Sequence, residues 1–309
     1  MTSGAERLRP AWRSLPQGIR TAVVDVIGGR FAADSPAHGG FSAGYAGVVT
    51  TTGGRAFVKA CAADWHADSL RFLREEIRTL SLLPSTVGPR VLAAIDTEEG
   101  VAVVLSAIDG RHPGAPWTTE DLRAIAVSLA VLAGTPAGSR MGRVEDRIIP
   151  GFTRWGAIAE DQRLHGPLPA LLRDRLPELQ RLEHGFRDAV HGEMIVHDDL
   201  RADNILISEG SAHFLDWPHA RRGAAWVDLP WLLPSIEATG GPPCEDAWLI
   251  FQDHGAPPVE AMLPVISGFA SFLWHSQAQP EIVELPGLRR FQRRQAGPAL
   301  RWLAQALPD

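Results

Sequence analysis

The chain has 309 residues, of which 45% are hydrophobic and 21% charged, a balance typical of a globular protein with a buried core. Its formal net charge of −6 argues against binding to nucleic acids or anionic membranes through a basic surface. The two cysteines, Cys61 and Cys244, suggest neither a disulfide framework nor a zinc site. No stretch has the pattern of a signal peptide or a membrane span, so we expect a cytoplasmic protein.

The first part of the chain, residues 22–105, is expected to form mainly strands, beginning with the apolar run 23–27. Residues 46–51 and 56–60 flank the turn sequence Thr52-Gly53-Gly54, which predicts a hairpin. Apolar residues at helical spacing predict one helix over 68–83. Two further strands are expected at 90–96 and 101–107.

Helices dominate the rest of the sequence. Thr118 is typical of a helix N-cap, and helices are expected from there to about 133 and over 151–190. Short strands at 194–196, 204–207 and 213–215 surround a polar loop. The sequence therefore predicts an α+β fold with two lobes: residues 1–107 as a small antiparallel sheet with one helix, and residues 108–309 as a larger, mainly helical lobe.

Lys59 is the only lysine, and the other 29 basic residues are arginines. It lies near the end of an apolar strand, where a compact ammonium group could hold the phosphates of a nucleotide. A surface lysine without a function is the alternative interpretation of this residue on its own.

The densest polar cluster is the segment Val196-His197-Asp198-Asp199-Leu200-Arg201-Ala202-Asp203-Asn204, followed by Ile205-Leu206. Asp216 then ends another apolar strand. Phosphoryl transfer needs a carboxylate that orients the attacking hydroxyl and oxygen ligands for Mg²⁺. The spacing His-x-Asp-Leu-x-x-x-x-Asn, followed by a strand that ends in Asp, is the pattern of a kinase catalytic loop and metal site.

These residues resemble the aminoglycoside phosphotransferase family, small-molecule and antibiotic kinases of the protein-kinase-like fold. Its loop usually reads His-Gly-Asp-Leu-His-x-x-Asn-Ile-Leu, with a later strand that ends in Asp-Trp, here Asp216-Trp217. The resemblance implies that Asp199 is the catalytic base and that His197 orients the loop. It also implies that Asn204 and Asp216 bind Mg²⁺, and that Asp228 braces the catalytic loop.

The resemblance further implies that Lys59 binds the α- and β-phosphates of ATP and pairs with a glutamate on the next helix. Glu76 fits the family's Glu-x-x-x-Leu spacing, and Glu75 is then expected to be a solvated charge. The loop over the phosphates would include Gly40, Phe41 and Ser42. Backbone groups between Ser106 and Ile108 would bind the adenine.

The sequence departs from this pattern at Asp198, where the family usually has glycine, and at Arg201, which could contact the γ-phosphate or an anionic acceptor. The two adjacent carboxylates, Asp198 and Asp199, are expected to point apart, although their repulsion could raise a pKa. The absence of an Ala-Pro-Glu segment argues against a phosphorylation-gated protein kinase.

The expected function is transfer of the γ-phosphate of ATP to a hydroxyl of a small molecule, an antibiotic such as an aminoglycoside, a nucleoside or another natural product, giving resistance or self-protection. The alternatives are a metabolite kinase of the same fold, acting on a sugar, an amino alcohol or choline, and a nucleotide-binding pseudoenzyme. An acceptor pocket for a polycation would need carboxylates, for which the sequence offers Glu237, Asp246, Asp253 and Glu260. Trp231, Trp248 and Trp274 could line a pocket, but helix packing is the favoured interpretation.

Overall fold

The computed structural model describes residues 9–37, 43–114, 116–283 and 285–308. The chain forms two compact units, one comprising Met1–Gly110 with Phe214–His219 and the other Arg111–His213 with Ala220–Asp309. The first unit thus extends past the expected boundary at residue 107 and takes in a segment from the second half of the chain. This segment carries Asp216, which forms an ion pair with Lys59.

The first unit contains the antiparallel sheet that the sequence predicts. Its five strands follow the order β1-β2-β3-β5-β4, and each pair of neighbours is antiparallel. The expected hairpin at residues 52–54 connects β2 to β3. The strands are β1 (Phe31–Pro36), β2 (Tyr45–Thr51), β3 (Arg55–Ala62), β4 (Val91–Thr97) and β5 (Gly100–Ser106).

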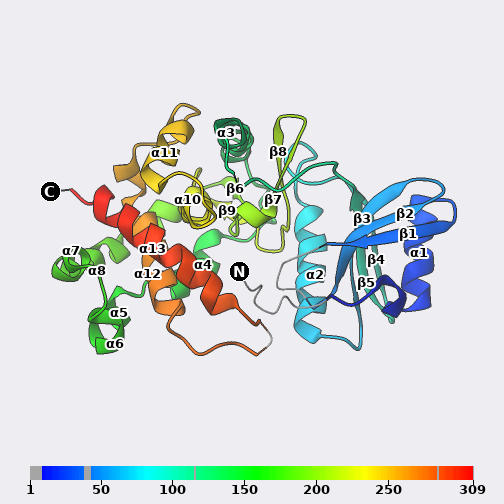
Figure 1. Cartoon of the computed structure of the whole chain (residues 1–309), viewed down its shortest axis with the longest axis horizontal. Helices are drawn as coiled ribbons and strands as arrows, with labels where there is room; N and C mark the ends of the chain where they lie inside the picture. Colours follow the sequence, from blue (N-terminus) through cyan, green and yellow to red (C-terminus); the bar gives the residue numbers. More distant parts are fainter. Residues whose placement is uncertain (1–8, 38–42, 115, 284, 309) are drawn as a thin grey trace. The chain divides into compact units, whose positions relative to one another are not determined.

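Two helices cover opposite faces of this sheet (Figure 1): α1 (Gln17–Ile27) and α2 (Ala67–Leu80). Because side chains alternate along a strand, successive residues of β3 face different helices. Val58 packs into the buried cluster with α1 residues Ile19 and Val23. The next residue, Lys59, reaches Glu76 of α2 on the other face.

Residues 23–27 form part of α1, so the expectation that they belong to a strand-rich stretch is wrong. Ile19 and Val23 lie four residues apart and are buried, whereas Val26 is exposed. This is burial with a helical period rather than the alternation of a strand. Gly28 ends the helix with a φ of 87°, a conformation that glycine adopts without steric cost.

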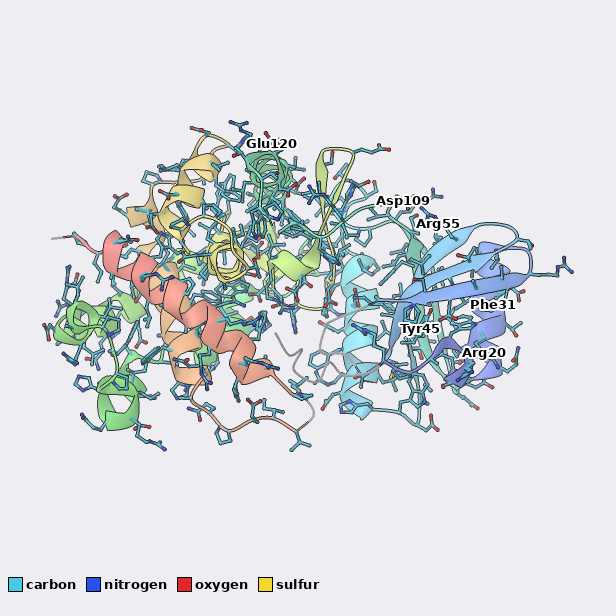
Figure 2. The ribbon with its side chains drawn as sticks, in the orientation of Figure 1. Arg20, Phe31, Tyr45, Arg55, Asp109 and Glu120 are labelled. Atoms are coloured by element: carbon cyan, nitrogen blue, oxygen red, sulfur yellow. The ribbon has the colours of Figure 1, made fainter. Side chains whose placement is uncertain are left out.

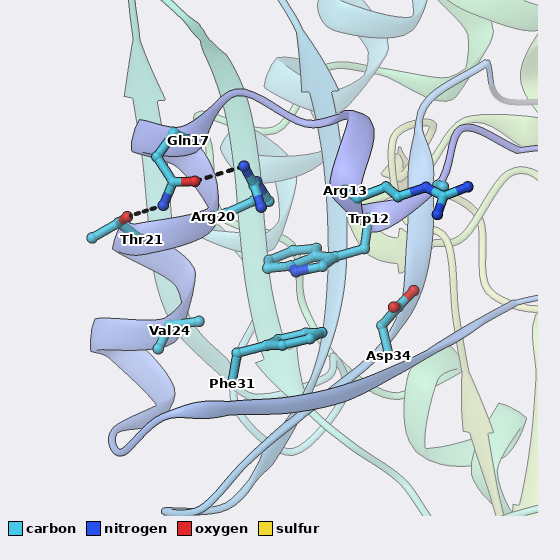
Figure 3. Close-up of a pocket in the computed structure, with 9 residues that line it drawn as sticks. Trp12, Arg13, Gln17, Arg20, Thr21, Val24, Phe31 and Asp34 are labelled. Carbon is cyan, nitrogen blue, oxygen red and sulfur yellow. Dashed lines mark hydrogen bonds between the residues drawn. The ribbon is translucent and has the colours of Figure 1, made fainter.

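A cavity of about 610 Å³ lies beside α1, on the face of the sheet that this helix covers (Figure 3). Trp12, from the short helix η1 (Trp12–Ser14), stacks on Phe31 with ring centroids 5.8 Å apart (Figure 3). The indole of Trp12 also contacts the ring of Tyr45. Gln17 accepts a hydrogen bond from Arg20 and donates one to Thr21. Because Lys59 reaches α2 on the opposite face, the sheet separates this cavity from Lys59.

The second unit is mainly helical, as predicted. Thr118 caps α3 (Thr119–Ala133) by accepting a hydrogen bond from the N–H of Asp121. The expected helix over 151–190 consists of short segments, because prolines and glycines interrupt it. Its segments, with the helix before them, are α4 (Val144–Phe152), α5 (Trp155–Glu160), α6 (Gln162–His165), α7 (Ala170–Asp174), α8 (Leu176–His184) and α9 (Phe186–Val190).

Short strands frame the polar loop of the second unit. They form two pairs of hydrogen-bonded strands. β6 (Met194–Val196) runs antiparallel to β9 (Arg221–Gly223), and β7 (Ile205–Ser208) pairs with the next strand, β8 (Ser211–Phe214). The remaining elements are η2 (Ala202–Asn204), α10 (Leu229–Ala238), α11 (Cys244–Gln252), η3 (Val259–Met262), α12 (Leu263–Ser276) and α13 (Leu288–Ala306).

Aromatic side chains form much of the helical core. Trp231 stacks between Phe152 and Phe269, with ring centroids 4.7 and 4.6 Å away. Trp248 is buried as well, and the indole of Trp274 donates to the carbonyl of Leu164. These tryptophans therefore pack helices, which is the role the sequence favoured. Within the described ranges, no helix is both long and apolar enough to cross a membrane.

Candidate active site

In the first unit, Lys59 lies at the centre of a cluster of three charged side chains. Its Nζ is 2.6 and 2.9 Å from the two carboxylate oxygens of Glu76 and 2.7 Å from Oδ1 of Asp216. The expected ion pair between β3 and α2 is thus present, and Asp216 joins it from a segment 157 residues away in the sequence. One ammonium group holds two carboxylates together.

The environment of this cluster stabilises its charged lysine. Burial alone would lower the pKa of Lys59, but the carboxylates of Asp216 and Glu76 outweigh it and raise that pKa above its ordinary value. Glu76 has a side chain only 5% exposed, and its burial raises its own pKa although Lys59 opposes this. The ion pair therefore depends on Lys59 to keep a buried carboxylate charged.

Helix α2 presents Glu76 to Lys59 because its N-terminal turn is fixed. His66 caps the helix by accepting a hydrogen bond from the N–H of Ser69, and the hydroxyl of Ser69 accepts one from Ala43. The neighbouring Glu75 pairs with Arg78 on the same helix instead. Of the two glutamates considered, only Glu76 contacts the lysine.

Two groups of predicted nucleotide-binding residues have different outcomes. Gly40, Phe41 and Ser42 lie outside the described residues. Ser106 ends β5, and its N–H donates to the carbonyl of Arg90, so this amide already has a partner within the sheet. Ile108 follows in the connection, where Asp109 pairs with Arg55 of β3 (Figure 2).

In the second unit, the polar loop has its backbone held by side chains from other elements. Asp228 accepts hydrogen bonds from the N–H groups of both His197 and Asp198, each at 2.8 Å. The hydroxyl of Ser235 accepts one from Ala202. The bracing role expected for Asp228 is confirmed, whereas nothing in the sequence pointed to Ser235.

Asp199 and Asn204 are neighbours within this loop. The amide of Asn204 donates to the carbonyl of Asp199 at 2.9 Å, which fixes the five-residue turn between them. Arg201 holds the carboxylate of Asp199, with Nη1 at 2.8 and 2.9 Å from its two oxygens. The guanidinium of Arg201 also pairs with Asp203 and lies over the ring of Phe291 of α13.

The side chain of Asp198 is buried and has a different ion-pair partner from that of Asp199. Arg147 of α4 contacts it twice: Nε bonds the carboxylate, and Nη2 donates to the backbone carbonyl at 2.6 Å. Burial raises the pKa of Asp198, and Arg147 opposes this. The raised pKa follows from burial rather than from repulsion between the two neighbouring carboxylates, which was the expected cause.

Asp228 is also buried, and burial raises its pKa to about 7 despite the two N–H groups that bond its carboxylate. Charges of Asp198 and Asp199 act in the same direction. The loop thus gathers three carboxylates, and the guanidinium of Arg147 has its pKa raised because their attraction exceeds the cost of its burial.

The predicted metal ligands provide the hard oxygen donors that Mg²⁺ prefers. Asn204 belongs to the second unit; its amide nitrogen donates to Asp199, so its amide oxygen is the atom of this side chain that could act as a ligand. Asp216 belongs to the first unit and has a carboxylate that is nearly half exposed. No cluster of three or more His, Cys, Asp or Glu forms a metal site among the described residues. Each of these two oxygen donors is of the kind that Mg²⁺ accepts together with nucleotide phosphates.

The site residues thus fall into two groups. Lys59, Glu76 and Asp216 meet in the first unit; His197, Asp199 and Asn204 share the loop of the second. Sequence reasoning missed Arg147, which lies on a helix 51 residues before its partner. The one available signal was Asp198 itself, a carboxylate between two apolar strands that needs a counter-charge if buried.

The protein-kinase-like class of phosphotransferases is defined by two features. One is a five-stranded antiparallel sheet with a lysine–glutamate pair, and the other is a helical unit with a loop of the catalytic type. The model of one family, described as the phosphotransferase enzyme family, matches residues 36–263. The chain belongs to this family and is a phosphotransferase. No curated protein sequence matches it.

Solved structures share the fold of this chain. Spectinomycin phosphotransferase, solved with ADP and spectinomycin, has a TM-score of 0.60 and 12% identity, covering 94% of this chain and 98% of the other. A microcompartment-associated aminopropanol kinase has a TM-score of 0.56 and 17% identity over 93% and 98%. An aminoglycoside phosphotransferase from Streptomyces rimosus, solved with ADP and streptomycin, has a TM-score of 0.53 and 19% identity over 82% and 97%. At these identities the likeness concerns the fold.

Proposed function

We propose that this phosphotransferase moves the γ-phosphate of ATP to a hydroxyl group of a small molecule in the cytoplasm. The observation that carries the proposal is the contact of Lys59 with both Glu76 and Asp216, because it prepares an ammonium group and a metal-binding carboxylate for the same triphosphate. Relatives of this fold were solved with ADP, which supports a nucleotide as the phosphate donor.

In the proposed reaction, Lys59 holds the α- and β-phosphates, and Glu76 keeps its ammonium group in place. Asn204 and Asp216 would hold Mg²⁺, which supplies charge neutralisation for the phosphate oxygens when bound. His197 lies buried at the start of the loop, where it helps to set the backbone that leads to Asp199.

Asp199 would accept the hydrogen bond of the acceptor alcohol and orient its oxygen in line with the γ-phosphorus. The new bond forms between that oxygen and phosphorus while the bond from phosphorus to the β–γ bridging oxygen breaks. The alcohol proton passes to Asp199, and ADP leaves. Since Arg201 now holds both oxygens of Asp199, the acceptor has to take over part of this contact.

Two classes of acceptor remain in the proposal: an antibiotic, with resistance as the outcome, and a metabolite such as an amino alcohol or a sugar. Three of the four carboxylates considered for a polycation pocket are exposed: Asp246, Asp253 and Glu260. Glu237 is committed to Arg301 and to the N–H of Cys244. These observations favour an acceptor with less positive charge than a polyamine antibiotic.

The test is ADP release from ATP and Mg²⁺ over a panel that contains aminoglycosides, spectinomycin, nucleoside antibiotics, sugars, choline and amino alcohols. With a true acceptor, the amount of ADP released equals the amount of phosphomonoester product, which is identified by ³¹P NMR. The Asp199→Asn variant serves as the inactive control. If the chain binds ATP and Mg²⁺ but phosphorylates nothing, and Asp199→Asn leaves the cellular phenotype unchanged, the pseudoenzyme alternative is supported and the proposal is overturned.

A further inference from the structure

Asp198 has a backbone conformation that is unusual for its side chain. Its φ is 62°, in the left-handed region, which glycine adopts freely and which other residues adopt at a cost. The family pattern places glycine at this position, directly before the catalytic aspartate. Here the position instead carries a carboxylate that is only 1% exposed.

Such a buried carboxylate requires compensation, and Arg147 provides the ion pair, with a further attraction from the charge of Arg221. Arg147 bonds Oδ2 of Asp198 through Nε and the carbonyl of Asp198 through Nη2. Among the described residues, Oδ1 of Asp198 has no hydrogen-bond partner. Arg147 is therefore the principal partner of this charge, since burial of an unpaired carboxylate is strongly unfavourable.

Arg147 is held in place by its own helix. Val144 and Ile148, on either side of it in α4, are both buried, with at most 1% of their surface exposed. They anchor the first two turns of α4 in the core and leave Arg147 beside the loop. Its guanidinium is thus positioned by packing that does not involve the loop itself.

The two peptide groups that flank the Cα of Asp198 are consequently each held by a side chain. The N–H of Asp198 donates to Asp228, and its C=O accepts from Arg147. The next residue is Asp199, whose own carbonyl accepts from Asn204. The direction in which Asp199 leaves the backbone is therefore set by three side chains from outside the turn or at its end.

We propose that Arg147 is a positioning residue of the reaction: together with Asp198 it forms a clamp that replaces the usual glycine and orients Asp199. This proposal rests on the proposed function, in which Asp199 aligns the acceptor hydroxyl. Arg147 acts through the peptide of Asp198 and contacts neither substrate nor nucleotide in this role. The two side chains work as a pair: a chain that keeps the Asp198 carboxylate but lacks Arg147 should have a lower kcat than a chain that lacks both.

The experiment is a double-mutant cycle with Arg147→Met, Asp198→Gly and the combination of the two. Displacement of a catalytic group by about 1 Å can cost on the order of 100-fold in rate. We expect Arg147→Met to lower kcat about 30- to 100-fold while KM for ATP changes less than about 2-fold, because Lys59 and its partners are untouched. Asp198→Gly should stay within about 5-fold of the wild type, since glycine accepts the φ of 62°.

The decisive measurement is the double variant. It should recover kcat at least about 10-fold relative to Arg147→Met, because the unpaired buried carboxylate is gone. Arg147→Met with kcat within about 3-fold of the wild type would overturn the proposal, as would a double variant no better than the single one. A kcat that is unchanged while KM for ATP rises would also overturn it.

Two further variants keep the test valid if Arg147→Met does not fold. Arg147→Lys can make one of the two bonds and should give an intermediate kcat, and Asp198→Asn should make Arg147→Lys less harmful. Arg175→Met is the matched control, because Arg175 pairs with Glu178 at 2.7 Å in the same unit and is similarly buried, but lies outside the loop and its braces. It should leave kcat unchanged.

Failure of the clamp and failure of the proposed function give different results. Backbone hydrogen exchange at residues 197–199 is measured alongside kcat. If the wild type phosphorylates no acceptor, the proposed function fails, and faster exchange in Arg147→Met that Asp198→Gly reverses still shows the clamp. If the wild type is active and neither exchange nor kcat responds to Arg147→Met, the clamp alone is overturned.

Discussion

Replacement of Lys59 by methionine tests the charge balance of the first unit most directly. Methionine keeps a long unbranched side chain but removes the ammonium group that bonds Glu76 and Asp216. Glu76 would then be a carboxylate 5% exposed without its cation, whereas Asp216 is far more accessible to water. Most of the cost should therefore come from Glu76.

The expected size follows from these exposures. Removal of one partner from a buried ion pair costs about 3–5 kcal/mol, whereas an exposed pair contributes about 0–1 kcal/mol. We expect Lys59→Met to lower the free energy of unfolding of the first unit by about 3–4 kcal/mol at pH 8. The added change Glu76→Gln should restore about 2 kcal/mol, because it removes the unpaired charge.

The penalty should also depend on pH. Burial raises the pKa of Glu76, and loss of Lys59 removes the charge that opposes this. A carboxyl whose folded-state pKa lies above its unfolded value stabilises the protein most at low pH and loses that contribution as pH rises. The destabilisation by Lys59→Met should thus be smaller at pH 5 than at pH 8.

The assay is urea unfolding of the ligand-free chain, with hydrogen exchange of α2 and β3 amides to assign the change to the first unit. Arg74→Met is the matched control, because Arg74 of the same helix pairs with Asp96 at 2.9 Å on the surface. It should cost clearly less than Lys59→Met, because exposed ion pairs contribute little to stability. A cost for Lys59→Met no larger than the control, or no recovery on adding Glu76→Gln, would refute the reasoning.

Three further changes test other parts of the structure. Burial raises the pKa of Asp228 to about 7, so its contribution to stability is full below about pH 4 and declines as pH rises to about 7. The difference in unfolding free energy between wild type and Asp228→Asn should accordingly shrink between pH 5 and 7.5. A constant difference would contradict the raised pKa. Asp199→Asn should lower kcat about 100-fold or more with little change in the Kd for ATP measured by calorimetry; weaker ATP binding with normal turnover would argue against its role as base. Trp12→Ala should lower the free energy of unfolding in urea by about 3–5 kcal/mol, because the indole is buried. Phe31→Ala, on the exposed side of the same aromatic stack, should cost clearly less. Equal costs would show that burial of the indole does not account for the contribution of Trp12.

How much the sequence predicts depends on the distance over which a residue finds its partner. The hairpin of β2 and β3 follows from a local turn, and the pairing of Lys59 with Glu76 follows from a strand and a helical spacing close together in the chain. The loop with Asp199 and Asn204 was recognisable because its polar residues are contiguous between apolar strands.

The errors arose where local pattern and tertiary structure disagree. Residues 23–27 are rich in β-branched side chains, which favour strands locally, yet α1 forms because Ile19 and Val23 together can cover the sheet. The contact of Arg147 with Asp198 spans 51 residues and joins a helix to a loop. No periodicity or turn chemistry specifies such a pair, so only the three-dimensional structure could identify it.

The solitary lysine has a practical consequence. Since the chain contains one ε-amino group, and since this group is protonated and enclosed by two carboxylates, acylating reagents should modify it far more slowly than an ordinary solvent-exposed amine. Mass spectrometry of such labelling would report, from a single position and without any engineered probe, how often the buried ion-pair cluster of the first unit becomes accessible.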